Sequence, residues 1–175
     1  TVCLKTLGLS AVMALAGLTA APLSWTGGDS VIELQSRCSA LAGRLTLPVQ
    51  AAAVFAVGWR ARRVGLSDDP LRFHAAAVVA FAAFGKVLSP QYVLWLIPLV
   101  ASLGGRLGAQ ARGLLLAACV LTTAVYPWSF FDLLDFSPGA VALLNARNAL
   151  LVGLWVLLTF GPPDGIRFAA RTRIA

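Results

Sequence analysis

A lysine in an apolar setting, flanked by hydrogen-bonding groups, is the first place where this sequence could do chemistry. Lys86 lies in the stretch Phe-Gly-Lys-Val-Leu-Ser-Pro-Gln-Tyr, which also contributes Ser89, Gln91 and Tyr92. Pro90 disfavours helix at the residue before it, so a new helix can begin there with its free amides facing an anion. The types and spacing of these residues predict a phosphate-binding turn.

A second basic residue, Arg147, lies inside another apolar run, in Leu-Asn-Ala-Arg-Asn. It is about seven residues from the start of that run, a depth of about 10 Å at helical rise. A guanidinium at the centre of a membrane span costs roughly 2.5 to 3.5 kcal/mol, and such groups face a bundle interior or a wet cavity. Asn145 and Asn148 bracket it and form a polar stripe on one helix face.

Each basic residue has two interpretations. Lys86 either snorkels to a lipid phosphate or meets an anionic ligand that arrives from outside. Arg147 either pairs with Asp132 or Asp135, or lines one externally open cavity together with Lys86 and neutralises a lipid-linked phosphate. The sequence leaves both pairs of alternatives open.

The composition restricts which elements can hold these residues. Of the 175 residues 59% are hydrophobic and 12% are charged, and the mean hydropathy is +0.83. Ordinary soluble domains are roughly 45 to 50% apolar and about 25% charged, which excludes a soluble enzyme. The three cysteines form no CxxC pair, and HExxH and GxxxxGK[ST] motifs are absent. We therefore expect no metal, cofactor or disulfide framework.

The apolar residues fall into six segments, close to the length of about 20 residues that spans a bilayer. The predicted segments are 7–23, 41–59, 71–88, 92–103, 109–126 and 140–160. The fourth is short and is either tilted, re-entrant or extended toward Leu107. The prediction is an all-α fold, a polytopic integral membrane helical bundle of about six membrane segments that forms a single domain over 1–175.

The positive charge, a net +7, is distributed as membrane topology requires. Short cytoplasmic loops hold excess Lys and Arg. With the N-terminus inside, ten of the 14 basic residues fall in the cytoplasm: Lys5, Arg60, Arg62, Arg63, Arg72, Arg106, Arg112, Arg167, Arg171 and Arg173. Both termini are then cytoplasmic, and the charge indicates topology rather than nucleic-acid binding.

Two external segments have predicted structure of their own. Ser30 and Glu33 fit a capping box, so residues 30–44 form either a helix at the membrane interface or an extension of the second span. Residues 126–135 mix aromatic side chains with Asp132 and Asp135 and contain no basic residue. Aromatic residues at that level are typical of a membrane-interface belt.

A family resemblance follows from these motifs. The stretch 86–98, Lys-Val-Leu-Ser-Pro-Gln-Tyr-Val-Leu-Trp-Leu-Ile-Pro, resembles the hallmark segment of glycosyltransferase family 87, bacterial membrane enzymes that include polyprenyl-phosphate-mannose-dependent alpha-mannosyltransferases. Leu-Thr-Thr-Ala-Val-Tyr-Pro at 121–127, Phe-Asp-Leu at 131–133 and Ala-Arg-Asn-Ala-Leu-Leu at 146–151 are similar to that family's C-terminal pattern, in the same order. The likeness covers about residues 70–160.

The resemblance implies a GT-C type enzyme of the bacterial plasma (inner) membrane. Such an enzyme moves a sugar, here mannose, from a polyprenyl-phosphate donor to a glycolipid or glycan acceptor at the external face, without a metal. It implies donor phosphate or sugar binding by Lys86, Ser89, Gln91, Tyr92, Arg147 and Asn148. The six segments resemble the C-terminal portion of the family, so the chain is expected to be a C-terminal fragment that lacks the catalytic Asp; the catalytic residues are unknown.

Two other functions fit the same features. A transporter or flippase fragment would also contain a buried arginine and broken helices. A non-catalytic packing module would pair Arg147 with Asp132 or Asp135 and place Lys86 among lipid headgroups. Paired and capped charges would favour the packing module, whereas an open polar cavity that holds both Lys86 and Arg147 would favour donor binding.

Overall fold

The computed structural model describes residues 4–5, 24–28, 31–35, 37–65, 69–85, 87–88, 90–135 and 137–162. The first predicted membrane segment, 7–23, lies outside the described residues, as do Lys86, Ser89 and the arginines after residue 162.

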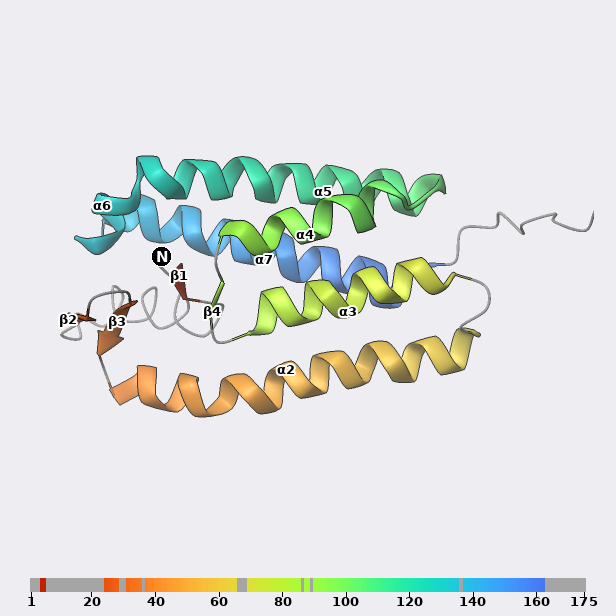
Figure 1. Cartoon of the computed structure of the whole chain (residues 1–175), viewed down its shortest axis with the longest axis horizontal. Coiled ribbons are helices and arrows are strands. Elements are labelled where there is room, and N and C mark those ends of the chain that lie inside the picture. Colours follow the sequence, from red (N-terminus) through yellow and green to blue (C-terminus); the bar gives the residue numbers. More distant parts are fainter. Residues whose placement is uncertain are drawn as a thin grey trace, which may run out of the picture.

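The described chain is a bundle of roughly parallel and antiparallel helices (Figure 1). Its long helices are α2 (Arg37–Val64), α3 (Pro70–Phe84), α4 (Pro90–Ala101), α5 (Gly105–Thr123) and α7 (Pro138–Phe160). These five coincide with the second to sixth predicted segments. The fourth segment does not extend toward Leu107, because α4 ends at Ala101 and a short turn precedes α5.

Local sequence explains where α3 begins and ends. The Asp69 side chain accepts a hydrogen bond from the backbone N–H of Arg72 at 3.2 Å, which caps the helix start, and Pro70 occupies the first helical position. Proline is favoured there because its missing N–H would have no helical partner. Gly65, with a φ of 99°, terminates the preceding helix in the left-handed conformation that favours glycine.

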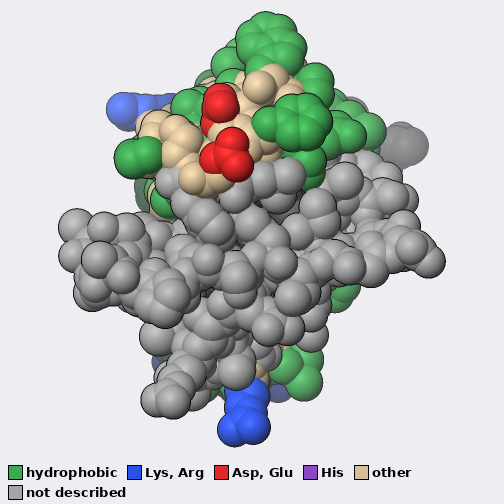
Figure 2. Space-filling view, turned by 90° about the vertical axis from the view of Figure 1, so that its left-hand side faces the viewer, with side chains coloured by type: hydrophobic (Ala, Val, Ile, Leu, Met, Phe, Trp, Pro, Cys, Tyr) green, Lys and Arg blue, Asp and Glu red, His purple; other side chains and the backbone are tan. Residues whose placement is uncertain are grey.

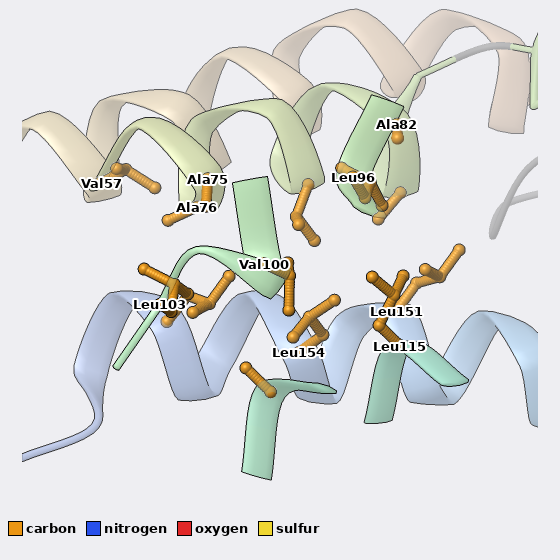
Figure 3. Packing of buried hydrophobic residues seen from close by; sticks show 14 of the residues in the cluster. Val57, Ala75, Ala76, Ala82, Leu96, Val100, Leu103, Leu115, Leu151 and Leu154 are labelled. Atoms are coloured by element: carbon orange, nitrogen blue, oxygen red, sulfur yellow. The ribbon is translucent and has the colours of Figure 1, made fainter. Parts of the chain in front are cut away.

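Small side chains let α3 occupy the middle of the bundle, in contact with α2, α4 and α7. Its inward positions are mostly alanine, and Ala75, Ala76 and Ala80 are fully buried. Leu96 and Val100 of α4 meet Leu115 of α5 and Leu151 and Leu154 of α7 in the same cluster (Figure 3). The bundle core is therefore continuous across all five long helices.

Between α5 and α7 the chain changes direction through a π-helical turn, η1 (Ala124–Trp128), and a short helix, α6 (Phe130–Leu134). Tyr126 leaves the helical conformation with φ −134° and ψ 121°. Pro127 follows it and has no N–H to continue the hydrogen-bond ladder. The predicted end of the fifth segment at residue 126 is confirmed by this break.

Four short strands lie at the periphery: β1 (Leu4–Lys5) pairs with β4 (Val87–Leu88), and β2 (Ser24–Gly28) pairs with β3 (Val31–Gln35). The predicted interfacial helix over 30–44 is wrong, because residues 31–35 form a strand whose backbone bonds go to β2. Its alternative, an upstream extension of the second helix, holds from Arg37 onward.

Lys5 also departs from its predicted side. Its backbone pairs with Val87, next to the turn that joins α3 to α4. That turn is on the side of the bundle away from the loop that joins α2 to α3 (Figure 1). Lys5 therefore does not lie with the arginines predicted to be cytoplasmic.

Most described basic side chains lie toward one end of the bundle, although exposed Arg44, near the start of α2, lies toward the other. Arg60, Arg62 and Arg63 end α2, Arg72 starts α3, and Arg106 and Arg112 lie in the first turns of α5, all at the same end. We call this the arginine end. The opposite end, which we call the α6 end, displays acidic side chains among apolar ones (Figure 2).

Large apolar side chains are exposed along the sides of the bundle, among them Leu47, Phe55, Leu94 and Leu116. Two helical stretches, Gly105–Trp128 and Pro138–Phe160, are long and apolar enough to cross a membrane, and only 33% and 39% of their apolar windows is buried within the chain. The core helix of a soluble protein is mostly buried, so these exposed apolar surfaces favour a lipid environment.

Candidate functional site

Arg147 is the largest fully buried side chain in the described structure. Its Nε and Nη2 both donate to the Oδ1 of Asn148, at 3.1 and 2.7 Å. Its Nη1 is buried and has no hydrogen-bond partner. A guanidinium has five N–H donors and no acceptor, so this one retains donor capacity for an anion.

The acidic alternative for Arg147 is not observed. In the described part of the chain, no ion pair joins it to Asp132 or Asp135, and both carboxylates are exposed near α6. Buried charges are ordinarily paired because their desolvation is costly. A buried cation whose one described partner is a neutral amide is therefore unusual for a purely structural residue.

The helix around Arg147 explains how the site is held. Pro138 starts α7 in the favoured first position, and a leucine series at Leu144, Leu151 and Leu154 packs that face into the core. Asn145 donates from Nδ2 to the carbonyl of Val141 at 2.9 Å. Asn148 is thus the amide that orients the guanidinium, whereas Asn145, two residues before Arg147, lies on a different face of α7.

The turn between α3 and α4 lies partway along the bundle instead of at its end. The beginning of α3, the end of α4 and the end of α7 meet at the arginine end (Figure 1). Counted from there at about 1.5 Å per residue, Phe84 is about 21 Å deep and Pro90 about 17 Å. The turn therefore stops about 14 Å short of the full length of α7, which is about 35 Å.

Arg147 is at nearly the same level. It precedes Phe160 by 13 residues, or about 20 Å of helix. The described flanks of the 86–92 turn thus end about 14 Å short of the α6 end of α7, and the membrane face at which this turn lies stays a prediction. The ring of Phe84 meets the ring of Trp155 edge to face, with centroids 5.1 Å apart, which packs the end of α3 on α7.

The structure describes only some of the remaining predicted site residues. Gln91 belongs to the first turn of α4, and its side chain lies outside the description together with Lys86 and Ser89. Tyr92 is partly buried against the core and packs on Trp95, with ring centroids 5.0 Å apart. The structure thus brings Arg147 and Asn148 into contact and leaves convergence of Lys86 with them a prediction.

A second buried arginine, Arg72, was not predicted as a site residue. Its Nε donates to the carbonyl of Leu158 and its Nη2 to that of Gly161, both at 2.6 Å. These carbonyls belong to the last turn of α7, where backbone acceptors lack helical partners and a cation is favoured. Arg72 therefore closes the end of α7, and its partners, 86 and 89 residues away, left no mark in the local sequence.

Two other buried polar atoms on α7 lack partners in the described structure: Nε1 of Trp155 and Oγ1 of Thr159. Both residues lie within an apolar run, so nothing in the sequence indicates that their polar atoms would be unpaired. Together with Nη1 of Arg147 they give α7 three buried groups without a partner among the described residues.

The α6 end is aromatic as well as acidic. The rings of Tyr126, Phe130 and Phe131 contact one another in sequence, with centroids 5.8 and 5.6 Å apart. Trp128 and Phe131 are 78% and 74% exposed. This distribution agrees with the interface-belt interpretation of residues 126–135.

In the part of the chain that the structure describes, no group of three His, Cys, Asp or Glu side chains could hold a metal ion. No family model matches the chain, and neither the curated proteins nor the solved structures contain a match.

Proposed function

We propose that this chain is the donor-binding part of a multi-pass membrane glycosyltransferase of about six membrane segments in the bacterial plasma membrane. The enzyme moves a sugar, mannose in our proposal, from a polyprenyl phosphate to a glycolipid or glycan acceptor. The observation on which the proposal depends is Arg147: fully buried, joined to Asn148, and left with an unpartnered Nη1.

The proposed chemistry is charge neutralisation in a low-dielectric site. When the sugar leaves, the polyprenyl phosphate gains negative charge, and donors already in place stabilise that charge without reorganising. Arg147 supplies a fixed guanidinium at mid-depth, held by Asn148. Lys86 and the polar groups of Ser89, Gln91 and Tyr92 complete the phosphate site in this proposal, and the prenyl chain lies along the apolar sides of the helices.

The proposed orientation follows from charge. The arginine end faces the cytoplasm, since short cytoplasmic loops hold excess Arg and Lys. The α6 end, with exposed aromatic residues and Asp132 and Asp135, faces outward. We place the end of α7 on the cytoplasmic side, and the pairing of Lys5 with Val87 argues against placing the N-terminal strand there too.

The test measures binding of a polyprenyl phosphate to the full chain in lipid nanodiscs. Arg147→Met should weaken binding about 10- to 150-fold, the value of a hydrogen bond to a charged group. Arg106→Gln, which removes an exposed arginine at the other end, is the matched control and should bind normally. The corresponding polyprenol, which lacks the phosphate, should bind both proteins equally weakly.

If Arg147→Met and the unmodified chain bind polyprenyl phosphate equally well, Arg147 is not part of a donor site. Transfer of labelled sugar is a separate measurement, because the chain is expected to need a catalytic Asp that we have not assigned. Binding without transfer would support the donor site and would not by itself test the acceptor chemistry.

A flippase is the second candidate, favoured by one observation: α3 and α4 are too short to cross a membrane and reverse at mid-depth. Half-helices that end inside the membrane are typical of transporter binding sites. Lipid scrambling in proteoliposomes separates the two candidates, since a glycosyltransferase binds the donor without moving it between leaflets.

A further inference from the structure

Among the described residues, the outer face of α2 around residues 55–63 is exposed and has no packing partner. Ala53, Val57 and Ala61 line the opposite, buried face of α2. Phe55, Trp59, Arg62 and Arg63 are exposed. Spacings of four, seven and eight residues place these four side chains on one helix face. We call them the α2 stripe.

The α2 stripe changes character along its length. Phe55 is 74% exposed and purely apolar, and Trp59, one turn further on, is half exposed and amphipathic. Arg63 follows after another turn, with its guanidinium carbon 5.1 Å from the centre of the Trp59 ring. The order over about 12 Å of helix is apolar, interfacial, cationic.

No acidic side chain that the structure describes pairs with the arginines of the α2 stripe. Among the described residues neither Arg62 nor Arg63 forms an ion pair, and Asp69 at the same end is engaged in capping α3. Nε of Arg60, which borders the stripe, is buried and has no hydrogen-bond partner. An anion at this level would meet two exposed guanidinium groups and a third nearby.

We propose that one anionic phospholipid binds along the α2 stripe. Its phosphate lies between Arg62 and Arg63, its glycerol region against Trp59, and an acyl chain along Phe55. Tryptophan favours the interfacial level of a membrane, and an arginine fork matches phosphate geometry. The proposal depends on membrane insertion of the bundle and not on glycosyl transfer.

The charge pattern selects a phospholipid over a second copy of the chain. A twofold pairing through the α2 stripe would bring arginines against arginines or leave them opposite apolar residues, and like charges repel. A soluble phosphate would use the arginines but leave Phe55 and Trp59 uncovered. An amphiphile with one anionic end satisfies every part of the stripe.

The test uses the full chain in neutral detergent, with phosphatidylglycerol as the probe and native mass spectrometry to measure binding. A basic residue at a membrane surface contributes about 1 kcal/mol toward anionic lipid. Arg63→Gln should therefore weaken binding about fivefold and the Arg62→Gln/Arg63→Gln pair about 25-fold. Arg106→Gln, an exposed arginine of the same end but outside the α2 stripe, should leave the affinity unchanged.

Tryptophan provides a second matched pair. Trp59→Leu should weaken phosphatidylglycerol binding about two- to fivefold through loss of the cation–π contact and the interfacial ring. Trp95→Leu, which removes another exposed tryptophan on α4, should not. Arg62→Lys/Arg63→Lys preserves the charge but not the fork, so it should bind more tightly than the Arg62→Gln/Arg63→Gln pair and less tightly than the unmodified chain, which separates charge loss from misfolding.

Three results would overturn the proposal: equal binding of phosphatidylglycerol and phosphatidylcholine, an equal loss in Arg63→Gln and Arg106→Gln, or equally strong binding of glycerol phosphate. The last would indicate a soluble anion site. All three leave the polyprenyl-phosphate measurement at Arg147 unaffected, so the two proposals fail independently.

Discussion

Arg72 and Arg147 bury the same side chain in two differently built surroundings. Arg72 is 3% exposed and donates to backbone carbonyls at the end of α7. Arg147 is 0% exposed, shares one amide oxygen through two of its nitrogens, and has an unpartnered Nη1. In the first surrounding, the guanidinium donates to the free carbonyls at the end of a helix. In the second, one nitrogen of the guanidinium has no hydrogen-bond partner among the described residues. Two arginines can therefore be almost equally buried and still differ in how completely their donors are satisfied.

The largest stability effect should come from Arg72. Arg72→Met leaves the carbonyls of Leu158 and Gly161 without their donors, and we expect the free energy of unfolding to fall by about 3 kcal/mol. Denaturant unfolding of the chain in micelles, followed by circular dichroism, measures the change. Arg72→Lys keeps the charge but cannot reach both carbonyls as a planar fork does, so it should recover only part of the loss.

A smaller loss should follow from Asn148→Leu. This change leaves the Nε and Nη2 of Arg147 without an acceptor inside the bundle, and we expect a loss of about 2 kcal/mol in the same unfolding assay. Asn145→Leu, on the same helix, removes a bond to the backbone of its own turn and serves as the control. A loss at Asn145 equal to that at Asn148 would show that the guanidinium does not depend on its amide.

The smallest effect should come from Arg147→Met, which changes the free energy of unfolding by less than about 1 kcal/mol, because replacing an incompletely paired buried charge with an apolar group is often neutral. The double variant Arg147→Met/Asn148→Leu should then be more stable than Asn148→Leu alone. If Arg147→Met lowers the free energy of unfolding as much as Arg72→Met does, Arg147 is a structural residue and the proposed difference between the two arginines is wrong.

The helices were predictable because hydropathy in long runs reports burial or lipid contact directly. Five of the six apolar segments are described as helices, and the break at Tyr126 agrees with the predicted end of a segment. The burial of Arg147 was predictable for the same reason, since its neighbours along α7 are apolar. Its contact with Asn148 followed from adjacency in the chain.

What could not be predicted depends on distant partners. Arg72 looked like an ordinary loop cation because its acceptors are backbone carbonyls of α7, and every residue type offers a carbonyl. Two-residue strands such as β1 and β4 have no hydropathy period to detect. The mid-depth position of the α3–α4 turn required knowing which helix ends meet, which segment lengths alone do not give.

The unequal helix lengths shorten the path into the bundle. A phosphate headgroup entering from the α6 end would travel about 14 Å to the level of the α3–α4 turn, less than half of the length of α7. Its tail could remain among the acyl chains of the leaflet from which it came. In the proposed donor complex, the charged headgroup would thus lose its water only over this short distance, at the end of which the guanidinium of Arg147 lies.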